Sequence, residues 1–198
     1  MEGLRGMTVL SLSTSDVPDL VINIKINVKG SFNLAKAFLP TRNAEATVIS
    51  INAGSIQVPG DFSSTFSAYN SSKFATLKFF EILAVENPDL HVVSMHPGVG
   101  KLVERPISGS DRNRGRADRP YVTVDTEMFQ KGKMQSVHVD TMELPSHFAV
   151  WLCSKDAEFL RGKFVWANWD VDQIKAKQSE IENSLLLTAN VIGWPFTA

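Results

Sequence analysis

The sequence lacks most of the features that mark secreted, membrane or nucleic-acid-binding proteins. Its 198 residues include one cysteine, Cys153, which excludes an internal disulfide and suits a reducing compartment. No apolar run approaches the roughly 18 residues of a membrane span, and the N-terminal residues show no signal-peptide pattern. The net charge of -1 gives no reason to expect a nucleic acid partner, and the four histidines show no metal-ligand spacing. We therefore expect a metal-free single domain, cytoplasmic by default, with no membrane or nucleic acid partner.

Apolar patterns along the chain alternate between two periods. Runs rich in β-branched residues, each containing or ending at a turn signal, predict buried strands at 46–54, 91–98 and 162–170. Apolar residues spaced by three or four predict helices at 18–39 and 66–86, and a further helix near 144–154. Strands that alternate with helices of this length predict an α/β fold with a parallel sheet.

Residues 100–123 do not fit this pattern. They lack apolar periodicity and contain six basic and three acidic residues, which is typical of a loop or disordered segment. Codons for Gly100-Lys101-Leu102 and Thr123-Val124 can encode an intron donor and acceptor, and removing the segment preserves the reading frame. Our hypothesis is that residues 100–123 translate a retained intron; a substrate lid is the alternative.

Tyr69 and Lys73, in the stretch "SAYNSSK", lie four positions apart and so on one helix face. A lysine ammonium near a phenol favours the phenolate and is expected to lower the pKa of the tyrosine from about 10 toward neutrality. A general acid/base working near pH 7 needs such a pKa. The same spacing also occurs by chance in many helices, so the pair alone does not establish catalysis.

The order of four motifs adds to this interpretation. "INVKGSFNLAKAFLP" (26–40), "VISINAG" (48–54), "SAYNSSK" (67–73) and "VVSMHPG" (92–98) follow one another at consistent separations. Together they resemble the classical short-chain dehydrogenase/reductase (SDR) family over about residues 15–99 and 124–198, and the chain's ending looks most like members from filamentous fungi. The resemblance implies a Rossmann-like, doubly wound parallel sheet in three α/β/α layers, with NAD or NADP as cofactor.

The resemblance also assigns roles to particular residues. Tyr69 matches the acid/base that exchanges a proton with the substrate oxygen, and Lys73 matches the residue that lowers its pKa and binds the nicotinamide ribose. Asn27 matches the asparagine that holds a water in the proton relay; alternatively it caps a helix start. Pro97 and Gly98 match the turn beside the nicotinamide.

Thr126 matches the threonine that follows this turn and holds the carboxamide. The family serine, which polarises the substrate carbonyl, has no clear counterpart. Its usual position falls on Asn52 or Ala53, so we expect Ser55 to take the role, with Ser50 as the fallback. Asn52 could donate a hydrogen bond to the substrate instead.

No G-x-x-x-G-x-G or G-x-G-x-x-G motif stands in the sequence, although a dinucleotide site of this type needs a Gly-rich turn before a helix N-terminus. By resemblance, we expect the N-terminal strands of the sheet to be missing, so that residues 1–198 form one partial domain. We predict an NAD(P)-dependent oxidoreductase acting on a secondary alcohol or ketone, weak or inactive as this chain stands.

The alternative function is non-catalytic. Family members commonly dimerise through the two helices that correspond to 18–39 and 66–86, and both are intact here. A remnant of the family could therefore act as a homodimer or by binding a partner. In either case, we expect the incomplete sheet to expose strand edges and apolar surface, and the chain to be poorly soluble.

Overall fold

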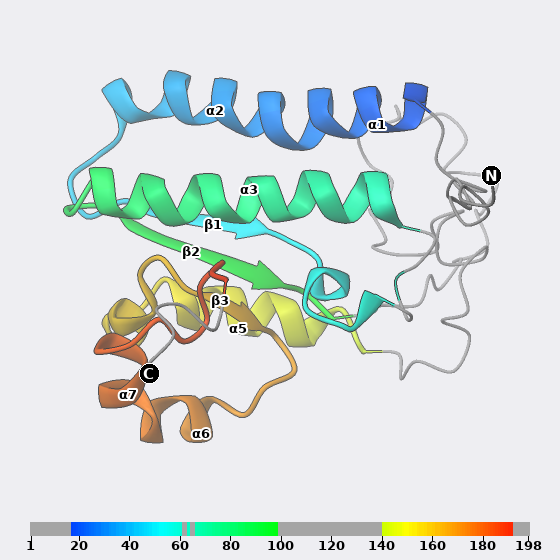
Figure 1. Cartoon of the computed structure of the whole chain (residues 1–198). Coiled ribbons are helices and arrows are strands. Elements are labelled where there is room, and N and C mark those ends of the chain that lie inside the picture. Colours follow the sequence, from blue (N-terminus) through cyan, green and yellow to red (C-terminus); the bar gives the residue numbers. More distant parts are fainter. Residues whose placement is uncertain (1–16, 61–62, 64–65, 99–139, 192–198) are drawn as a thin grey trace, which may run out of the picture.

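A computed structural model describes residues 17–60, 63, 66–98 and 140–191 (Figure 1). The predicted segment 100–123 and Thr126 lie outside these ranges. The helical elements are α1 (Val17–Asn23), the π-helical η1 (Ile24–Lys29), α2 (Gly30–Phe38), η2 (Leu39–Thr41), η3 (Gly54–Ile56), α3 (Ser67–Glu86), α5 (Glu143–Leu152), η7 (Lys155–Leu160), α6 (Val171–Ala176) and α7 (Gln178–Glu182). The strands are β1 (Thr47–Ile51), β2 (His91–His96) and β3 (Phe164–Trp166).

The described strands form one parallel sheet in the order β1-β2-β3. Thr47 pairs with His91 at the start of β1, and His96 pairs with Trp166 at the end of β3. The predicted strands and helices are confirmed, and each strand is shorter than its predicted range because the turn residues at its end leave the ladder. All three carboxyl ends therefore meet at one edge of the sheet.

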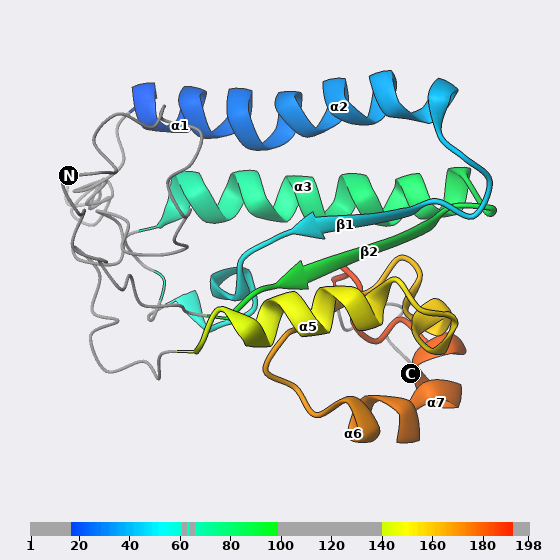
Figure 2. The same cartoon turned by 180° about the vertical axis from the view of Figure 1, so that it is seen from behind.

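Alternate residues of β2 supply two separate cores. Val92 packs with the buried residues of α2 and α3, whereas Val93 and Met95 pack with those of α5 and η7. This is the period of two expected of a strand buried on both faces. The helices α1 to α3 cover one face and α5 covers the other, as the two opposite views show (Figures 1 and 2). The arrangement is the predicted three-layer α/β fold, with three strands described.

The long helical segment formed by α1, η1 and α2 buries less of its apolar face than its periodicity suggests. Of the residues on that face, Ala35 is buried, but Leu20 and Phe32 leave 42% and 53% of their surface exposed. The reason is that α3 covers β2, and the long segment lies against α3 largely through α1 and η1. Among the described residues, no helix has the length and apolar character to cross a membrane.

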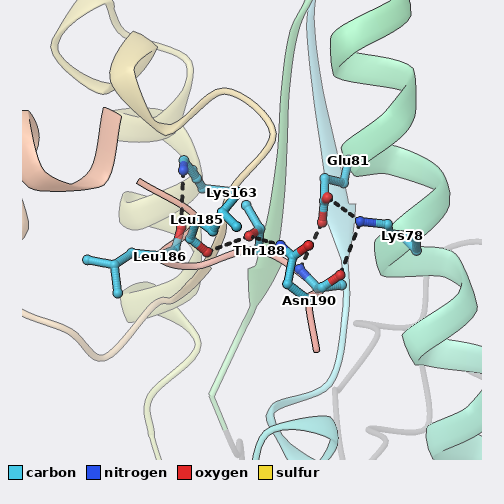
Figure 3. A network of polar contacts seen from close by, with 8 residues as sticks. Lys78, Glu81, Lys163, Leu185, Leu186, Thr188 and Asn190 are labelled. Carbon is cyan, nitrogen blue, oxygen red and sulfur yellow. Dashed lines mark hydrogen bonds and ion pairs between the residues drawn. The ribbon is translucent and has the colours of Figure 1, made fainter. Parts of the chain in front are cut away.

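Residues 184–190 close the outer edge of β3 (Figure 3). The backbone N–H of Phe164 donates to Leu187 O at 2.8 Å, and the buried Lys163 donates to the carbonyl oxygens of Ser184 and Leu186. Glu81 of α3 accepts from the Ala189 N–H at 2.8 Å. The segment is therefore bonded to both β3 and α3, and β1 is the open edge of the described sheet.

Gly54 follows β1 at the carboxyl edge of the sheet, where the packing leaves no room for a Cβ atom. A Cβ there would lie 2.7 Å from the Trp166 ring and 2.8 Å from the His96 ring. We expect Gly54→Ala to lower the free energy of unfolding by about 1–3 kcal/mol, the usual cost of overpacking. Urea unfolding followed by circular dichroism measures it. Gly60→Ala is the control, since no described atom lies within 4 Å of its Cβ position; equal losses in both variants would contradict the packing argument.

Candidate active site

Tyr69 and Lys73 lie in the first two turns of α3, at the carboxyl ends of β1 and β2 (Figure 1). The Lys73 ammonium donates to Ile51 O at 3.0 Å and lies 5.8 Å from the centroid of the Tyr69 ring. The backbone pairing of β1 with β2 uses Ala46 O and Asn52 N, so the carbonyl of Ile51 is directed away from β2. Lys73 therefore holds its ammonium at the open edge of β1.

Burial, more than charge, sets the protonation of this pair. Desolvation raises the pKa of Tyr69, and desolvation lowers the pKa of Lys73. The expected lowering of the Tyr69 pKa is therefore wrong for this structure. The physical reason is that burial opposes the phenolate, while the Lys73 ammonium bonds to the Ile51 carbonyl and lies 5.8 Å from the centroid of the ring.

Asn52 joins the end of β1 to the catalytic helix. It is 3% exposed, its Nδ2 donates to Lys73 O at 3.1 Å, and its Oδ1 accepts from the Ala53 N–H at 2.8 Å. Its amide is thus engaged within the protein, which argues against the donation to substrate considered from the sequence. Ser50, the fallback serine, is 5% exposed within β1.

Ser55 lies in η3 and bonds to the residue that follows Tyr69. Its hydroxyl donates to Asn70 Oδ1 at 2.6 Å, and Asn70 Nδ2 donates to Ser55 O at 3.3 Å. Both residues line a cavity of about 500 Å³ whose described lining mixes polar and apolar side chains without a charge: Ser55, Ile56, Val58, Ser63, Asn70, Ser71, Phe74 and Ala75. Ser55 is the candidate serine that borders such a cavity.

Asn27 lies within the π-helical turn η1, so it is not a helix cap. Its Nδ2 donates to Ser72 Oγ at 2.9 Å, and more weakly to Asn23 Oδ1 at 3.4 Å. Ser72 is the residue before Lys73, so Asn27 is bonded to the turn of α3 that carries both predicted catalytic groups. π-helical turns inside α-helices are often found at functional sites.

The Pro97–Gly98 turn follows β2 at the same edge of the sheet. Gly98 has a φ of 85°, and a Cβ there would collide with the Asp140 carboxylate, so glycine is required twice over. His96 packs edge-to-face on Trp166 with ring centroids 4.6 Å apart, and burial lowers its pKa. His96 is therefore a packed residue at the end of β2.

These residues fit one end of a nicotinamide dinucleotide. The Lys73 ammonium, one N–H of which is used on Ile51 O, and the Tyr69 hydroxyl offer polar groups suited to a ribose at the carboxyl edge. The sequence provides no Gly-rich turn for the pyrophosphate. No cluster of His, Cys, Asp or Glu suited to a metal ion occurs in the part of the chain that the structure describes.

Sequence reasoning missed two buried hydroxyls of α3. Ser72 and Thr76 are 0% and 3% exposed, and both bond to Asn27. With Tyr69 and Lys73 they follow the i, i+3, i+4, i+7 spacing, so the four residues lie on one broad face of α3. Polar residues that continue the Tyr69–Lys73 face of this helix were the available signal.

Known proteins resemble this chain over most of its length. A family model described as short chain dehydrogenase matches residues 5–104. A short chain dehydrogenase/reductase of Claviceps purpurea is 28% identical over 91% of this chain and 58% of that protein. The short chain dehydrogenase/reductase nsrO of Aspergillus novofumigatus is 30% identical over 84% of this chain and 52% of its own length.

A solved structure shows the same fold. A short chain dehydrogenase from Burkholderia cenocepacia, in complex with NADP, superposes with a TM-score of 0.57 at 15% identity. The match covers 82% of this chain and 60% of that chain. This chain therefore spans little more than half the length of the proteins it matches.

Titration of Tyr69 tests its protonation directly. Tyr121→Phe leaves Tyr69 as the sole tyrosine, so phenolate absorbance reports it alone. We expect a midpoint above the ordinary value of 10.0, because burial opposes the phenolate. By linkage, the neutral phenol contributes stability below that ordinary value, and this contribution is lost as pH rises through the folded-state pKa.

The same variant in denaturant is the reference and should titrate near 10.0. Adding Lys73→Met should leave the folded midpoint nearly unchanged. A midpoint near neutrality, which rises when Lys73 is replaced, would instead support the direction expected from the sequence.

Proposed function

Since the chain belongs to the short-chain dehydrogenase family, we propose that its site interconverts a secondary alcohol and a ketone with NAD or NADP. The observation that carries the proposal is the placement of Tyr69 and Lys73 together at the carboxyl edge of a parallel sheet. Ligands of open α/β sheets bind outside this edge.

Tyr69 is the proton donor in ketone reduction. Burial keeps its phenol protonated near pH 7, which is the form that can donate to a carbonyl oxygen as negative charge develops there. When bound, the nicotinamide supplies the hydride. Alcohol oxidation needs the phenolate, so we expect the burial of the phenol to slow oxidation near neutral pH.

Lys73 and Asn52 keep the catalytic turn in place. The bond from Asn52 Nδ2 to Lys73 O fixes the backbone of α3 against the end of β1. The Lys73 ammonium has three N–H donors, and its bond to Ile51 O leaves others for a ribose hydroxyl. Both residues therefore orient the reactants more than they change the pKa of Tyr69.

The cavity beside Ser55 supports a proposal on the kind of ketone, although neither Tyr69 nor Lys73 lines it. Its described lining residues combine serine hydroxyls and an asparagine amide with apolar side chains, and none of them is charged. A neutral ketone with apolar bulk fits such a surface better than a charged one, since a charge entering it would lose hydration without a counter-ion. Ser55 is the hydroxyl that we assign to the substrate carbonyl, and to donate there its hydrogen must leave Asn70 Oδ1.

We further propose that cofactor binding is weak in this chain. A Gly-rich turn at a helix N-terminus normally binds the pyrophosphate, and the sequence contains none. NADPH is the first cofactor to assay because the Burkholderia protein was solved in complex with NADP.

Replacing Tyr69 tests the proposed chemistry. With NADPH and a neutral aromatic ketone, we expect Tyr69→Phe to lower kcat by about 10²–10⁴-fold, the usual contribution of a positioned acid/base. The oxidation of NADPH, followed by absorbance, measures it. Tyr121→Phe is the matched control, with expected activity equal to the parent. Unchanged turnover in Tyr69→Phe would remove this residue from the mechanism, and NADPH saturation at micromolar concentration would contradict weak binding.

A second candidate function, pairing of two copies, rests on a separate observation. Large apolar side chains are exposed on the long helical segment and on the neighbouring α3: Ile22 (52%), Ile26 (66%), Leu34 (70%), Phe74 (46%), Ile82 (44%) and Val85 (72%). Extended apolar surfaces of this kind commonly mark interaction sites. We propose a homodimer through this surface, which is the non-catalytic alternative if turnover is absent.

Charge placed in this surface tests the dimer. We expect the parent to sediment as a dimer and Ile26→Glu/Leu34→Glu to sediment as a monomer, because association would bury two unpaired carboxylates. Val150→Glu on α5 is the control, since Val150 is equally exposed at 72% but lies on the opposite face. A monomeric parent, or dissociation in the Val150 variant as well, would refute this interface.

A further inference from the structure

We propose that Ser72 and Thr76 are positioning residues that fix Asn27 against the catalytic turn of α3. The proposal deepens the proposed function, on which it rests for the role of Asn27. It is carried by hydrogen bonds that join the half-buried Asn27 of η1 to the buried hydroxyls of α3, and none of these bonds uses the side chain of Tyr69 or Lys73.

Ser72 makes two different bonds with one hydroxyl. It donates to Tyr69 O at 2.7 Å and accepts from Asn27 Nδ2 at 2.9 Å. Because a backbone carbonyl can only accept, the hydroxyl hydrogen is committed to Tyr69, and Asn27 must present its NH₂ group to Ser72. The orientation of the Asn27 amide is thus decided by the bond that Ser72 makes one turn back on its own helix.

Thr76 stabilises the backbone of the same asparagine. In η1 the hydrogen bonds skip one residue further than in an α-helix, as in the bond from the Gly30 N–H to Lys25 O. The Asn27 carbonyl accepts from the Ser31 hydroxyl at 2.6 Å and lies 3.1 Å from the Thr76 hydroxyl. Thr76 has one hydroxyl hydrogen, which it shares between Asn27 O and Ser72 O, the latter at 2.9 Å, so it links the wide turn of η1 to the backbone of α3.

With these hydrogen bonds made, one atom of the Asn27 side chain can still accept a hydrogen bond. Its Nδ2 is engaged by Ser72 and Asn23, and its carbonyl oxygen by Ser31 and Thr76. Within the described residues, Oδ1 is the atom of Asn27 that remains to accept a hydrogen bond from a water. If Asn27 holds a relay water, Ser72 and Thr76 determine where that water sits relative to Tyr69.

The test uses variants of the full chain that change only hydroxyl groups. Ser72→Ala removes the acceptor of the Asn27 amide. Thr76→Val removes a hydroxyl at nearly constant volume, and Thr76→Ser keeps it. Ser146→Ala is the matched control, because Ser146 is an exposed helical serine that bonds to a backbone carbonyl, Met142 O at 2.8 Å, on α5, which covers the other face of the sheet.

Two readouts are needed. The first is hydrogen exchange of the Asn27 side-chain amide by NMR, with its signals identified by their loss in Asn27→Ala. We expect exchange to rise about 10-fold in Ser72→Ala, the equilibrium factor that one hydrogen bond supplies. The second is ketone reduction, where we expect kcat to fall about 10-fold in Ser72→Ala and Thr76→Val, with KM unchanged, as a group that orients the reaction predicts.

Rescue separates positioning from general stability. Thr76→Ser should match the parent in kcat, and Ser146→Ala should match it in both readouts. Unchanged amide exchange in Ser72→Ala, or equal kcat in Thr76→Val and Thr76→Ser, would overturn the proposal. If Ser72→Ala fails to fold, the Thr76 pair decides. A parent without turnover counts against the proposed function alone, and amide exchange in Ser72→Ala then decides the positioning.

Discussion

The burial of α3 against β2 is the interaction on which the rest of the molecule depends. Phe80, Leu83 and Ala84 fill the core beneath it, and each large side chain so buried contributes roughly 1.5–3 kcal/mol. With the helix axis fixed, its first two turns must project at the carboxyl edge of the sheet, where Tyr69 and Lys73 are found. The hydroxyls of Ser72 and Thr76, on the same broad face of α3, then reach η1. One helix thus connects the core, Tyr69 and Asn27.

Local pattern was enough to predict the elements, because period and turn residues depend on neighbours in sequence. The three strands, α3 and the placement of Tyr69 beside Lys73 followed from spacing alone. The direction of the Tyr69 pKa did not follow, since it depends on how deeply the phenol is buried and on which acceptor takes the lysine ammonium. The hydrogen bond of Asn52 could not be predicted either. Its bond to Lys73 O results from the approach of β1 to α3, and the two residues are 21 positions apart in the chain.

The residues assigned to the two parts of the reaction differ in number. Tyr69 and Lys73, to which we assign proton transfer and ribose binding, are held on α3, while the sequence offers no Gly-rich turn for a pyrophosphate. The chain spans 58% of its Claviceps relative, and its family match ends at residue 104. Proton transfer and dinucleotide affinity are therefore separable properties here, and a family assignment supports the first more directly than the second.

The C-terminal segment determines at which edge of the sheet a further strand could pair. Because residues 184–190 bond to Phe164 and Lys163, a strand that approached β3 from outside would first have to displace a buried ammonium from its carbonyl partners. At β1, within the described residues, only the single bond from Lys73 to Ile51 O stands in the way. Any strand added to this sheet, from the same chain or another, will therefore extend it on the side of β1. Its arrival would compete for the lysine that the catalytic turn contributes, so completing the sheet and releasing Lys73 would be one event.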